Sequence, residues 1–309
     1  MTALYAMPGN EAFADRLARH AGQPRRELQV HRFPDRESLV QVAAPVAQED
    51  VGLVCTLADP DGKVVPLLMA AATLRDLGAA RVGLVAPYLA YMRQDTRFNP
   101  GEAVSARIFG KLLGDAFDWL ITVDPHLHRY HSLDQAYRLD GRVVHAATRV
   151  AAWIGEHVVS PLIIGPDGES AQWVRDVANR LGAPFVVATK ERHGDRDVQV
   201  TLDGIEPWKS RTPVLVDDII ASGHTMIEAL HRLDLKASPA PVCIGVHGVF
   251  APGAVEELRA AGASRIVTSN TIDGDTALID ISTDIADVLS TLGQRKSTTH
   301  QDSSKDNRP

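Results

Sequence analysis

The chain has 309 residues, of which 45% are hydrophobic and 23% charged. This length and composition are normal for a folded protein of about two domains and exclude a mostly disordered one. The formal net charge of −7 argues against general nucleic-acid binding. No apolar run approaches the roughly 18 residues of a membrane span, and the first twenty residues lack the pattern of a secretion signal. We therefore expect neither nucleic acid nor membrane as a partner.

Short runs rich in valine, isoleucine and leucine recur along the chain and predict strands. They are continuous rather than alternating, which is typical of parallel strands covered on both faces. In chain order the runs cover residues 51–57, 81–89, 119–124, 162–167, 184–190, 213–220, 242–250 and 265–270. Apolar residues at three- and four-residue spacing predict helices between many of them, over residues 64–77, 103–113, 171–181, 225–233 and 254–261. The alternation predicts an α/β fold with mainly parallel sheets.

The order strand, helix, strand, long loop, strand occurs twice and predicts a duplicated domain. The first set opens at Val51, Arg81 and Trp119, and the second opens at Leu162, Pro184 and Val214. We place the first domain at residues 1–145 and the second at 146–293. Residues 39–46 alternate and predict an antiparallel edge strand or flap, whereas the polar residues 294–309 predict a disordered tail.

The chain has two cysteines, Cys55 and Cys243, and each lies inside an apolar run. This placement predicts buried free thiols rather than a disulfide framework. Free thiols fit a reducing compartment, so we expect a cytoplasmic protein.

The most informative segment is VLVDDIIASGHT at residues 214–225. It predicts a buried strand that ends in Asp217 and Asp218, a short loop and then a helix. In open α/β sheets ligands bind beyond the carboxyl ends of the strands, and a helix N-terminus suits phosphate. The carboxylates suit sugar hydroxyls or a metal. The pattern therefore predicts a sugar-phosphate site rather than an ordinary acidic strand end, with the loop residues Ala221, Ser222, Gly223, His224 and Thr225.

This segment resembles the phosphoribosyl-pyrophosphate (PRPP) motif of type I phosphoribosyltransferases and PRPP synthetases. Further segments resemble the synthetases in order along the chain. They are the flap FPDRE (33–37), the ATP loop that starts with RQD (93–95), TVDPH (122–126), GPD (165–167), KER (190–192) of the catalytic loop, HGVF (247–250) and SNTI (269–272). The chain is thus identified as similar to ribose-phosphate pyrophosphokinases, and closer to their archaeal-like short-loop members.

The resemblance implies two tandem phosphoribosyltransferase-type (type I) domains with an active site between them. The family transfers the β,γ-pyrophosphoryl group of ATP to the C1 hydroxyl of ribose 5-phosphate and releases AMP. The resemblance implies that Lys190 and Arg192 are catalytic. It also implies that ribose 5-phosphate is bound by Asp217, Asp218 and the loop 221–225. The residues that bind ATP by this resemblance are Phe33, Asp35, Glu37, Arg93, Gln94 and Asp95.

The same resemblance implies Mg²⁺ as the cofactor, with His126 and Asp167 as metal residues. It also implies a homo-oligomer, either a dimer or an assembly of dimers such as a hexamer. The spacing of His126, His128 and His131 leaves a zinc site as an alternative. The chain departs from the family where His224 and Arg36 stand in place of glycines.

Two other functions remain open at the level of sequence. One is a non-catalytic homologue that regulates an active synthetase by co-assembly, and the other is a phosphoribosyltransferase that consumes PRPP. The charged residues of the catalytic loop and the PRPP motif argue against the first. The ATP loop, the flap and the doubled domain argue against the second.

Overall fold

The computed structural model describes residues 2–43, 46–127, 132–133, 137–168, 170–192, 198–202, 204–233 and 239–292, without the side chains at 190–192 and 198–200. The predicted disordered tail therefore lies outside the described residues. Both cysteines are buried and free. None of the helices in the described part of the chain combines the length and the apolar character that crossing a bilayer requires.

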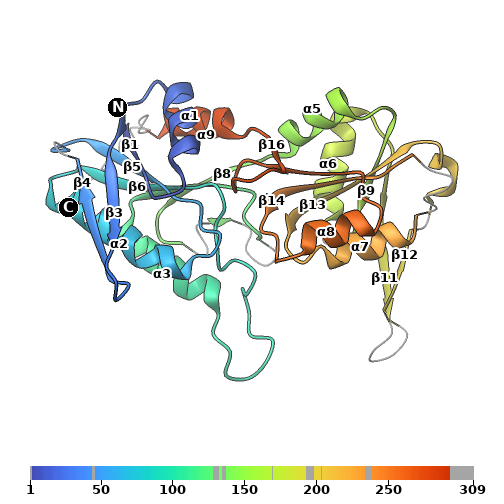
Figure 1. The fold of residues 1–309 in the computed structure, drawn as a ribbon, viewed down its shortest axis with the longest axis horizontal. Helices are drawn as coiled ribbons and strands as arrows, with labels where there is room; N and C mark the ends of the chain where they lie inside the picture. Colours follow the sequence, from blue (N-terminus) through green and yellow to red (C-terminus); the bar gives the residue numbers. More distant parts are fainter. Residues whose placement is uncertain are drawn as a thin grey trace, which may run out of the picture.

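Two six-stranded sheets form the framework of the molecule (Figure 1). The first has the order β2 (Arg25–Arg26), β1 (Thr2–Ala6), β5 (Asp50–Val54), β6 (Arg81–Ala86), β7 (Trp119–Val123) and β8 (Asp140–Val144). The second has the order β10 (Phe185–Val187), β9 (Pro161–Gly165), β13 (Thr212–Ile220), β14 (Val242–Gly248), β15 (Arg265–Ser269) and β16 (Ala277–Ile279). Every pairing within the two sheets is parallel, which confirms the predicted α/β class.

The internal repeat is real, but its predicted alignment is wrong by one unit. Strand β5 is third in the first sheet, and β13 is third in the second. The segment that starts at Val51 therefore matches the one at Val214, and not the one at Leu162. The prediction missed the first unit, β1 and helix α1 (Glu11–Ala21), because a five-residue strand at the start of a chain shows little hydrophobic pattern.

The two halves exchange a helix. Helix α5 (Ala147–His157) follows the last strand of the first sheet but packs against α6 (Ala171–Leu181) of the second half. Helix α9 (Ser282–Thr291) follows the last strand of the second sheet but packs against α1, β7 and β8 of the first. One hydrophobic core therefore runs through both halves. Helix α9 belongs to the second half by sequence but packs on the first sheet. The contacts therefore do not mark a boundary near residue 145, and that boundary remains a prediction.

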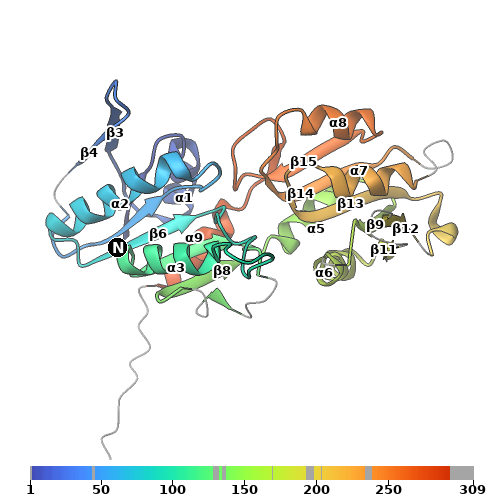
Figure 2. The ribbon, with the colours of Figure 1, turned by 90° about the horizontal axis from the view of Figure 1, so that it is seen from below.

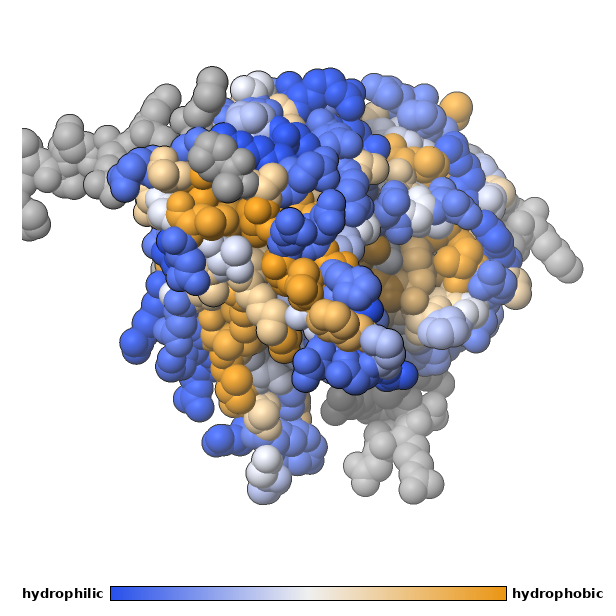
Figure 3. Space-filling model, turned by 60° about the vertical axis from the view of Figure 1, so that its left-hand side comes forward, coloured by the Kyte–Doolittle hydropathy of each residue, from blue (hydrophilic) through white to orange (hydrophobic). Residues whose placement is uncertain are grey.

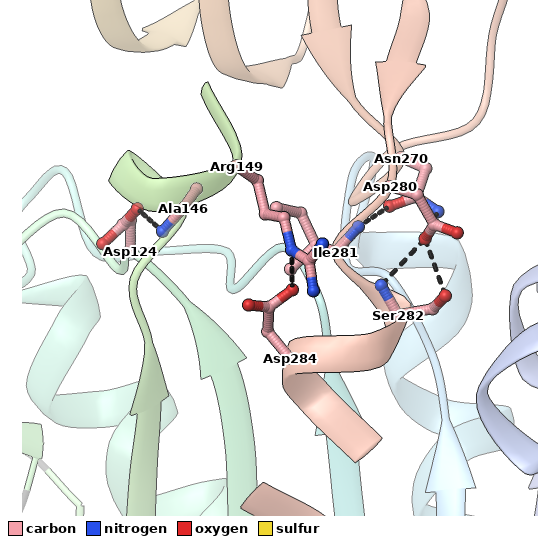
Figure 4. A network of polar contacts seen from close by, with 8 residues as sticks. All are labelled: Asp124, Ala146, Arg149, Asn270, Asp280, Ile281, Ser282 and Asp284. Atoms are coloured by element: carbon pink, nitrogen blue, oxygen red, sulfur yellow. Dashed lines mark hydrogen bonds and ion pairs between the residues drawn. The ribbon is translucent and has the colours of Figure 1, made fainter. Parts of the chain in front are cut away.

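Polar contacts fix the two crossing segments (Figure 4). The guanidinium Nε of Arg149, on α5, donates to the Asp284 carboxylate of α9 at 2.6 Å. The Asn270 side chain donates to Asp280 at 2.7 Å and accepts the N–H of Ile281 at 2.9 Å. Asn270 belongs to the SNTI segment, so this segment sets the start of α9.

The remaining helices lie over the outer faces of the two sheets (Figures 1 and 2). They are α2 (Asp61–Asp76) and α3 (Ser105–Ala116) in the first half, and α7 (His224–His231) and α8 (Ala254–Ala260) in the second. A short 3₁₀ turn covers Glu206–Trp208. Trp119 is 1% exposed and fills the space that Gly83, its partner on β6, leaves open.

Two hairpins stand apart from the sheets. Strands β3 (Leu28–Arg32) and β4 (Ser38–Val42) form one, and β11 (Thr189–Arg192) and β12 (Val198–Thr201) form the other. Both are antiparallel, and Figure 2 shows the first projecting from one end of the molecule. The antiparallel strand predicted over residues 39–46 is thus confirmed as β4.

Candidate active site

The site lies where β13 and β14 extend beyond the strands on either side of them. The pairing of β9 with β13 ends at Ile164 and Leu215, whereas β13 stays paired with β14 as far as Ile220 and Gly248. The last residues of β13 therefore project beyond the carboxyl edge of the sheet, which is where ligands bind in such folds. Asp217 and Asp218 lie on this projection. The ladder with β14 continues past them to Ile220, where the strand predicted over residues 213–220 also ends.

A tight turn joins β13 to α7. Gly223 has a φ of 72°, a left-handed conformation that favours glycine. A Cβ at this position would lie 3.1 Å from the Leu258 side chain of α8, so the turn is also closely packed. Helix α7 begins at His224, and the Ile227 N–H donates to the Gly223 carbonyl at 2.9 Å. The His224 N–H donates to the Ser222 Oγ at 3.4 Å, and the N–H groups that follow it are placed to bind an anion beside the Ser222 and Thr225 hydroxyls.

The turn forms part of a cavity of about 1050 Å³ between the two halves. The first half contributes Arg93 from the ATP loop, together with Asp124 and His126 after β7. The second half contributes Asp167 after β9, and the carboxylates and loop of β13–α7. The lining residues that the sequence predicted for the site are Arg93, His126, Asp167, Asp217, Asp218, Ala221, Ser222, Gly223, His224 and Thr225. Residues far apart in the chain thus meet around one space.

The two neighbouring aspartates have opposite electrostatic properties. Burial, followed by the charges of Asp218 and Asp167, raises the pKa of Asp217 to about 8. Burial also acts to raise the pKa of Asp218, but the hydrogen bond and charge of His126 outweigh it and lower that pKa. Asp217 therefore carries a proton near neutral pH in the free protein, whereas Asp218 is ionised.

His126 connects the two halves across the cavity. Its Nδ1 lies 2.7 Å from the Asp218 Oδ2. Since a carboxylate only accepts, this nitrogen donates. His126 follows a strand of the first sheet and Asp218 lies on one of the second, so the contact depends on how the halves are placed.

A second histidine, which the sequence did not assign to the site, holds the halves behind this contact. His247 on β14 is 1% exposed. Its Nε2 donates to the Val123 carbonyl at 3.0 Å, and its Nδ1 accepts from the Thr271 hydroxyl at 2.9 Å. Burial lowers the pKa of His247, which favours this neutral form. The resemblance of the HGVF segment to the family could have drawn attention to His247, but nothing in the sequence indicates that it would contact Val123 on β7.

Asp124 also escaped the sequence prediction. It lies just after β7 with a φ of 29° and is buried. Its carboxylate accepts the Ala146 N–H at 2.8 Å (Figure 4) and the His145 Nδ1–H at 2.8 Å. The hydrogen bond to Asp124 raises the pKa of His145. Asp124 thereby fixes the start of α5 beside the cavity.

The ATP loop after β6 is folded around Glu102. The Glu102 carboxylate accepts the N–H groups of Phe98 and Asn99, each at 3.0 Å. The Gln94 amide accepts the Ser105 hydroxyl at 3.0 Å. Arg93 lines the cavity, but Gln94 and Asp95 do not. The structure therefore brings one of the three predicted residues of the RQD motif directly to the site.

The predicted flap residues Phe33, Asp35 and Glu37 lie at the tip of the β3–β4 hairpin. This tip points away from the body of the molecule (Figures 1 and 2). The Phe33 ring is 41% exposed and packs edge-on against His31, with 4.9 Å between ring centroids. Arg36 has a φ of 73°, which agrees with the glycine usual here in the family. The three flap residues do not line the cavity of their own chain.

Lys190 and Arg192 lie on β11, opposite Val200 and Val198 of β12. Their side chains are outside the described part of the structure. The sequence placed both residues in a loop, which is wrong for their backbone, because an antiparallel pairing extends through Arg192. The end of the hairpin, residues 193–197, is not described.

The cavity residues fit a magnesium ion only with help from a substrate. Among the described residues, no three histidine, cysteine or carboxylate side chains gather as a metal cluster. His126 and Asp167 both line the cavity. Mg²⁺ prefers oxygen ligands and commonly binds through one or two carboxylates together with substrate phosphates and water; the candidate oxygen donor is the Asp167 carboxylate, with the His126 imidazole on the same cavity. His128 and His131, the other members of the zinc alternative, lie outside the described residues.

Comparisons with known proteins agree with this geometry. A family model described as the N-terminal domain of ribose phosphate pyrophosphokinase matches residues 2–116, and one described as a phosphoribosyl transferase domain matches residues 140–284. The ribose-phosphate pyrophosphokinase of Saccharolobus solfataricus is 33% identical over 262 residues, covering 82% of this chain and 88% of the relative. That of Methanobrevibacter smithii is 30% identical, covering 85% and 91%.

The fold has a match among solved structures. The phosphoribosylpyrophosphate synthetase of Mycobacterium smegmatis superposes with a TM-score of 0.81 at 22% identity, covering 94% of this chain and 99% of that one. The matching sequence relatives named above are archaeal, which agrees with the resemblance stated from the motifs. Taken with their identity and coverage, these matches show that the chain belongs to the ribose-phosphate pyrophosphokinase family.

Proposed function

We propose that the protein is a ribose-phosphate diphosphokinase that makes PRPP and AMP from ATP and ribose 5-phosphate. The observation that carries the proposal is the meeting of the β13–α7 turn, Arg93 and His126 around one cavity. A bond forms between the C1 hydroxyl oxygen and the β-phosphorus of ATP, while the bond from that phosphorus to the AMP oxygen breaks. The proton of the C1 hydroxyl is released to water.

Ribose 5-phosphate is proposed to bind at the β13–α7 turn. The 5-phosphate accepts hydrogen bonds from the first N–H groups of α7 and from the Ser222 and Thr225 hydroxyls. Asp217 and Asp218 accept hydrogen bonds from the ribose hydroxyls. Their side chains lie on the projecting end of β13, one step before the turn, so sugar and phosphate follow the chain in order.

ATP is proposed to bind on the opposite side of the cavity. Arg93 reaches the cavity directly and supplies a cation for the phosphates. Gln94 and Asp95 would complete this side after the loop around Glu102 rearranges. The hairpin with Lys190 and Arg192 follows β10, and these cations suit the charge that develops on the transferred oxygens.

Mg²⁺ is the proposed cofactor, held by His126 and Asp167 together with phosphate and ribose oxygens. When bound, it neutralises phosphate charge and orients the pyrophosphoryl group for transfer. The raised pKa of Asp217 supports the binding of a cation here, because the charges of Asp218 and Asp167 contribute to it when the site is free. His126 already donates from Nδ1 to Asp218, so the protein's own part is to present the other ring nitrogen, Nε2, and the Asp167 carboxylate to the cavity.

The flap residues are proposed to act in a neighbouring subunit. Phe33 is exposed at the tip of a hairpin that points away from its own cavity, so its ring is free to stack on adenine elsewhere. Figure 3 shows hydrophobic side chains gathered on the same end of the molecule. Exposed apolar side chains on the neighbouring elements β4, α2 and α3 are Leu39, Val65, Met69, Ile108 and Leu112. A homodimer, alone or within a hexamer, would cover such a surface.

Complementation tests the shared site. Inactive Lys190→Ala protein is mixed with inactive Phe33→Ala/Glu37→Ala protein under conditions where subunit exchange is verified. If sites are shared, some mixed interfaces combine an intact flap with an intact catalytic loop, and activity returns. If both parents are folded and no activity returns after exchange, each chain uses its own flap.

The activity itself is tested by mixing purified protein with ATP, Mg²⁺ and ribose 5-phosphate. We expect AMP and PRPP in equal amounts. A phosphoribosyltransferase would instead consume PRPP when given a base, and a regulatory homologue would produce neither product alone. The buried free thiols of Cys55 and Cys243 support a reducing compartment, and we propose the cytoplasm.

A further inference from the structure

His224 is the residue of the phosphate loop that departs most from a plain anion site. It is the first residue of α7 and lines the cavity. Its side chain is 74% exposed, and its Nε2 lies 3.0 Å from the Glu228 Oε1, one helical turn further on. A histidine at a helix N-terminus, where the dipole disfavours a cation, calls for a compensating anion. Glu228 supplies one.

The cavity has a shortage of positive charge. Its described lining includes five carboxylates, Asp124, Asp167, Asp176, Asp217 and Asp218, against one arginine and three histidines. Arg93 comes from the ATP side, while His126 and His145 are engaged with Asp218 and Asp124. His224 is the histidine that belongs to the phosphate loop itself.

The surroundings of His224 contain few other charges that could control it. Helix α7 packs against α8 and β12. Helix α8 meets the loop through Leu258, and its charged residues Glu256, Glu257 and Arg259 are exposed. Strand β12 has the sequence VQVT, which contains no ionisable residue. Among the side chains that the structure describes, the groups that bear on the imidazole are therefore Glu228 and, across the cavity, the carboxyl groups of Asp167, Asp217 and Asp218.

We propose that His224 binds the 5-phosphate as an imidazolium held by Glu228, so that affinity for ribose 5-phosphate falls as this histidine loses its proton. The inference rests on the proposed function, because it assigns the phosphate to this loop. Histidine ordinarily titrates between pH 5 and 8, whereas a phosphate monoester is mostly dianionic above pH 6.5. Deprotonation removes a cation and leaves the Glu228 charge to repel the dianion. ATP binding, on the other side, has no such dependence.

Calorimetric binding of ribose 5-phosphate at pH 6.5 and 8.5 tests the proposal. For the wild type we expect the Kd to rise about five- to tenfold between these values, as for the loss of one charge-assisted phosphate contact. The neutral variant His224→Gln should bind more weakly at pH 6.5, and its Kd should change less between the two pH values than that of the wild type; the change that remains is due to Asp217, whose pKa is about 8. His231→Gln removes an exposed histidine at the other end of α7 and should match the wild type.

A further variant separates the roles of the pair. Glu228→Gln removes the partner that holds the His224 side chain at 3.0 Å, so the Kd for ribose 5-phosphate at pH 6.5 should rise towards that of His224→Gln. If His224→Gln retains the wild-type dependence on pH while all variants form PRPP, the inference is wrong and the proposed function stands. If the wild type neither binds ribose 5-phosphate nor forms PRPP at any pH, the proposed function is wrong, and the inference that rests on it is wrong too.

Discussion

Asp217 destabilises the free protein, and its removal should show this. Burial, then the charges of Asp218 and Asp167, raise its pKa from 3.8 to about 8. Between these two pH values the folded protein binds a proton that the unfolded chain releases. Stability therefore falls as the pH rises from about 4 to about 8. Asp217→Asn removes the titrating group, yet its amide oxygen can still accept the Asp218 N–H, which lies 3.0 Å from Asp217 Oδ1.

The size of the effect follows from the shift. One pKa unit corresponds to about 1.4 kcal/mol, so a shift of about four units is worth about 6 kcal/mol at high pH. Salt solution in the open cavity screens the repulsion between the carboxylates. We therefore expect Asp217→Asn to gain about 2–3 kcal/mol over the wild type at pH 8.5 and almost nothing at pH 4.5.

Urea unfolding in EDTA at several pH values measures this difference. The variant should lose its affinity for ribose 5-phosphate while it gains stability, because an amide accepts hydrogen bonds less strongly than a carboxylate. Asp218→Asn is the matched control. His126 stabilises the ionised form of Asp218, so this variant should be less stable than the wild type at pH 7.5. Equal pH dependence in wild type and Asp217→Asn would refute the reasoning.

Three other variants test separate parts of the account. Lys190→Ala should lower kcat by about 100-fold or more with little change in KM or in unfolding by urea, since it removes a transition-state cation; an unchanged kcat would remove Lys190 from the mechanism. Gly83→Ala should destabilise the protein by about 3 kcal/mol, because the added Cβ would lie 1.8 Å from the Trp119 ring; a denaturation midpoint like that of the wild type would contradict this packing. Arg36→Gly should slow hydrogen exchange of the Phe33 and Arg36 amides about threefold, since glycine removes roughly 0.7 kcal/mol of strain at a φ of 73°, and faster exchange would speak against strain there.

The phosphate loop could be predicted from sequence because its chemistry is contiguous. Residues 217–225 contain the carboxylates, the glycine with positive φ and the helix start in one string. The strands were predictable for the same reason, since each is a short apolar run. The run predicted over residues 213–220 ends where β13 ends, although the aspartate pair alone suggested an earlier end. Here the ladder with β14 supports the extension.

Contacts between the halves could not be predicted, because they join residues far apart in the chain. Asp218 and His126 are 92 positions apart, and His247 and Val123 are 124 apart. No periodicity connects such residues. The exchange of α5 and α9 is equally invisible in sequence, because each helix has an ordinary amphipathic pattern whichever sheet it covers.

These long-range contacts also indicate which parts of the molecule can move during turnover. Exchanged helices, the Arg149–Asp284 ion pair and the buried His247 hold the two halves together around the cavity. A change in the angle between the halves would break all three. The β11–β12 hairpin, by contrast, has no ladder to the body among the described residues, and such hairpins are marginally stable alone. The β3–β4 hairpin packs against α2 and the core of the first half. We therefore expect closure over ATP to come from β11–β12 moving against a rigid cavity, so that the catalytic loop supplies the moving groups and the β13–α7 turn supplies the fixed one.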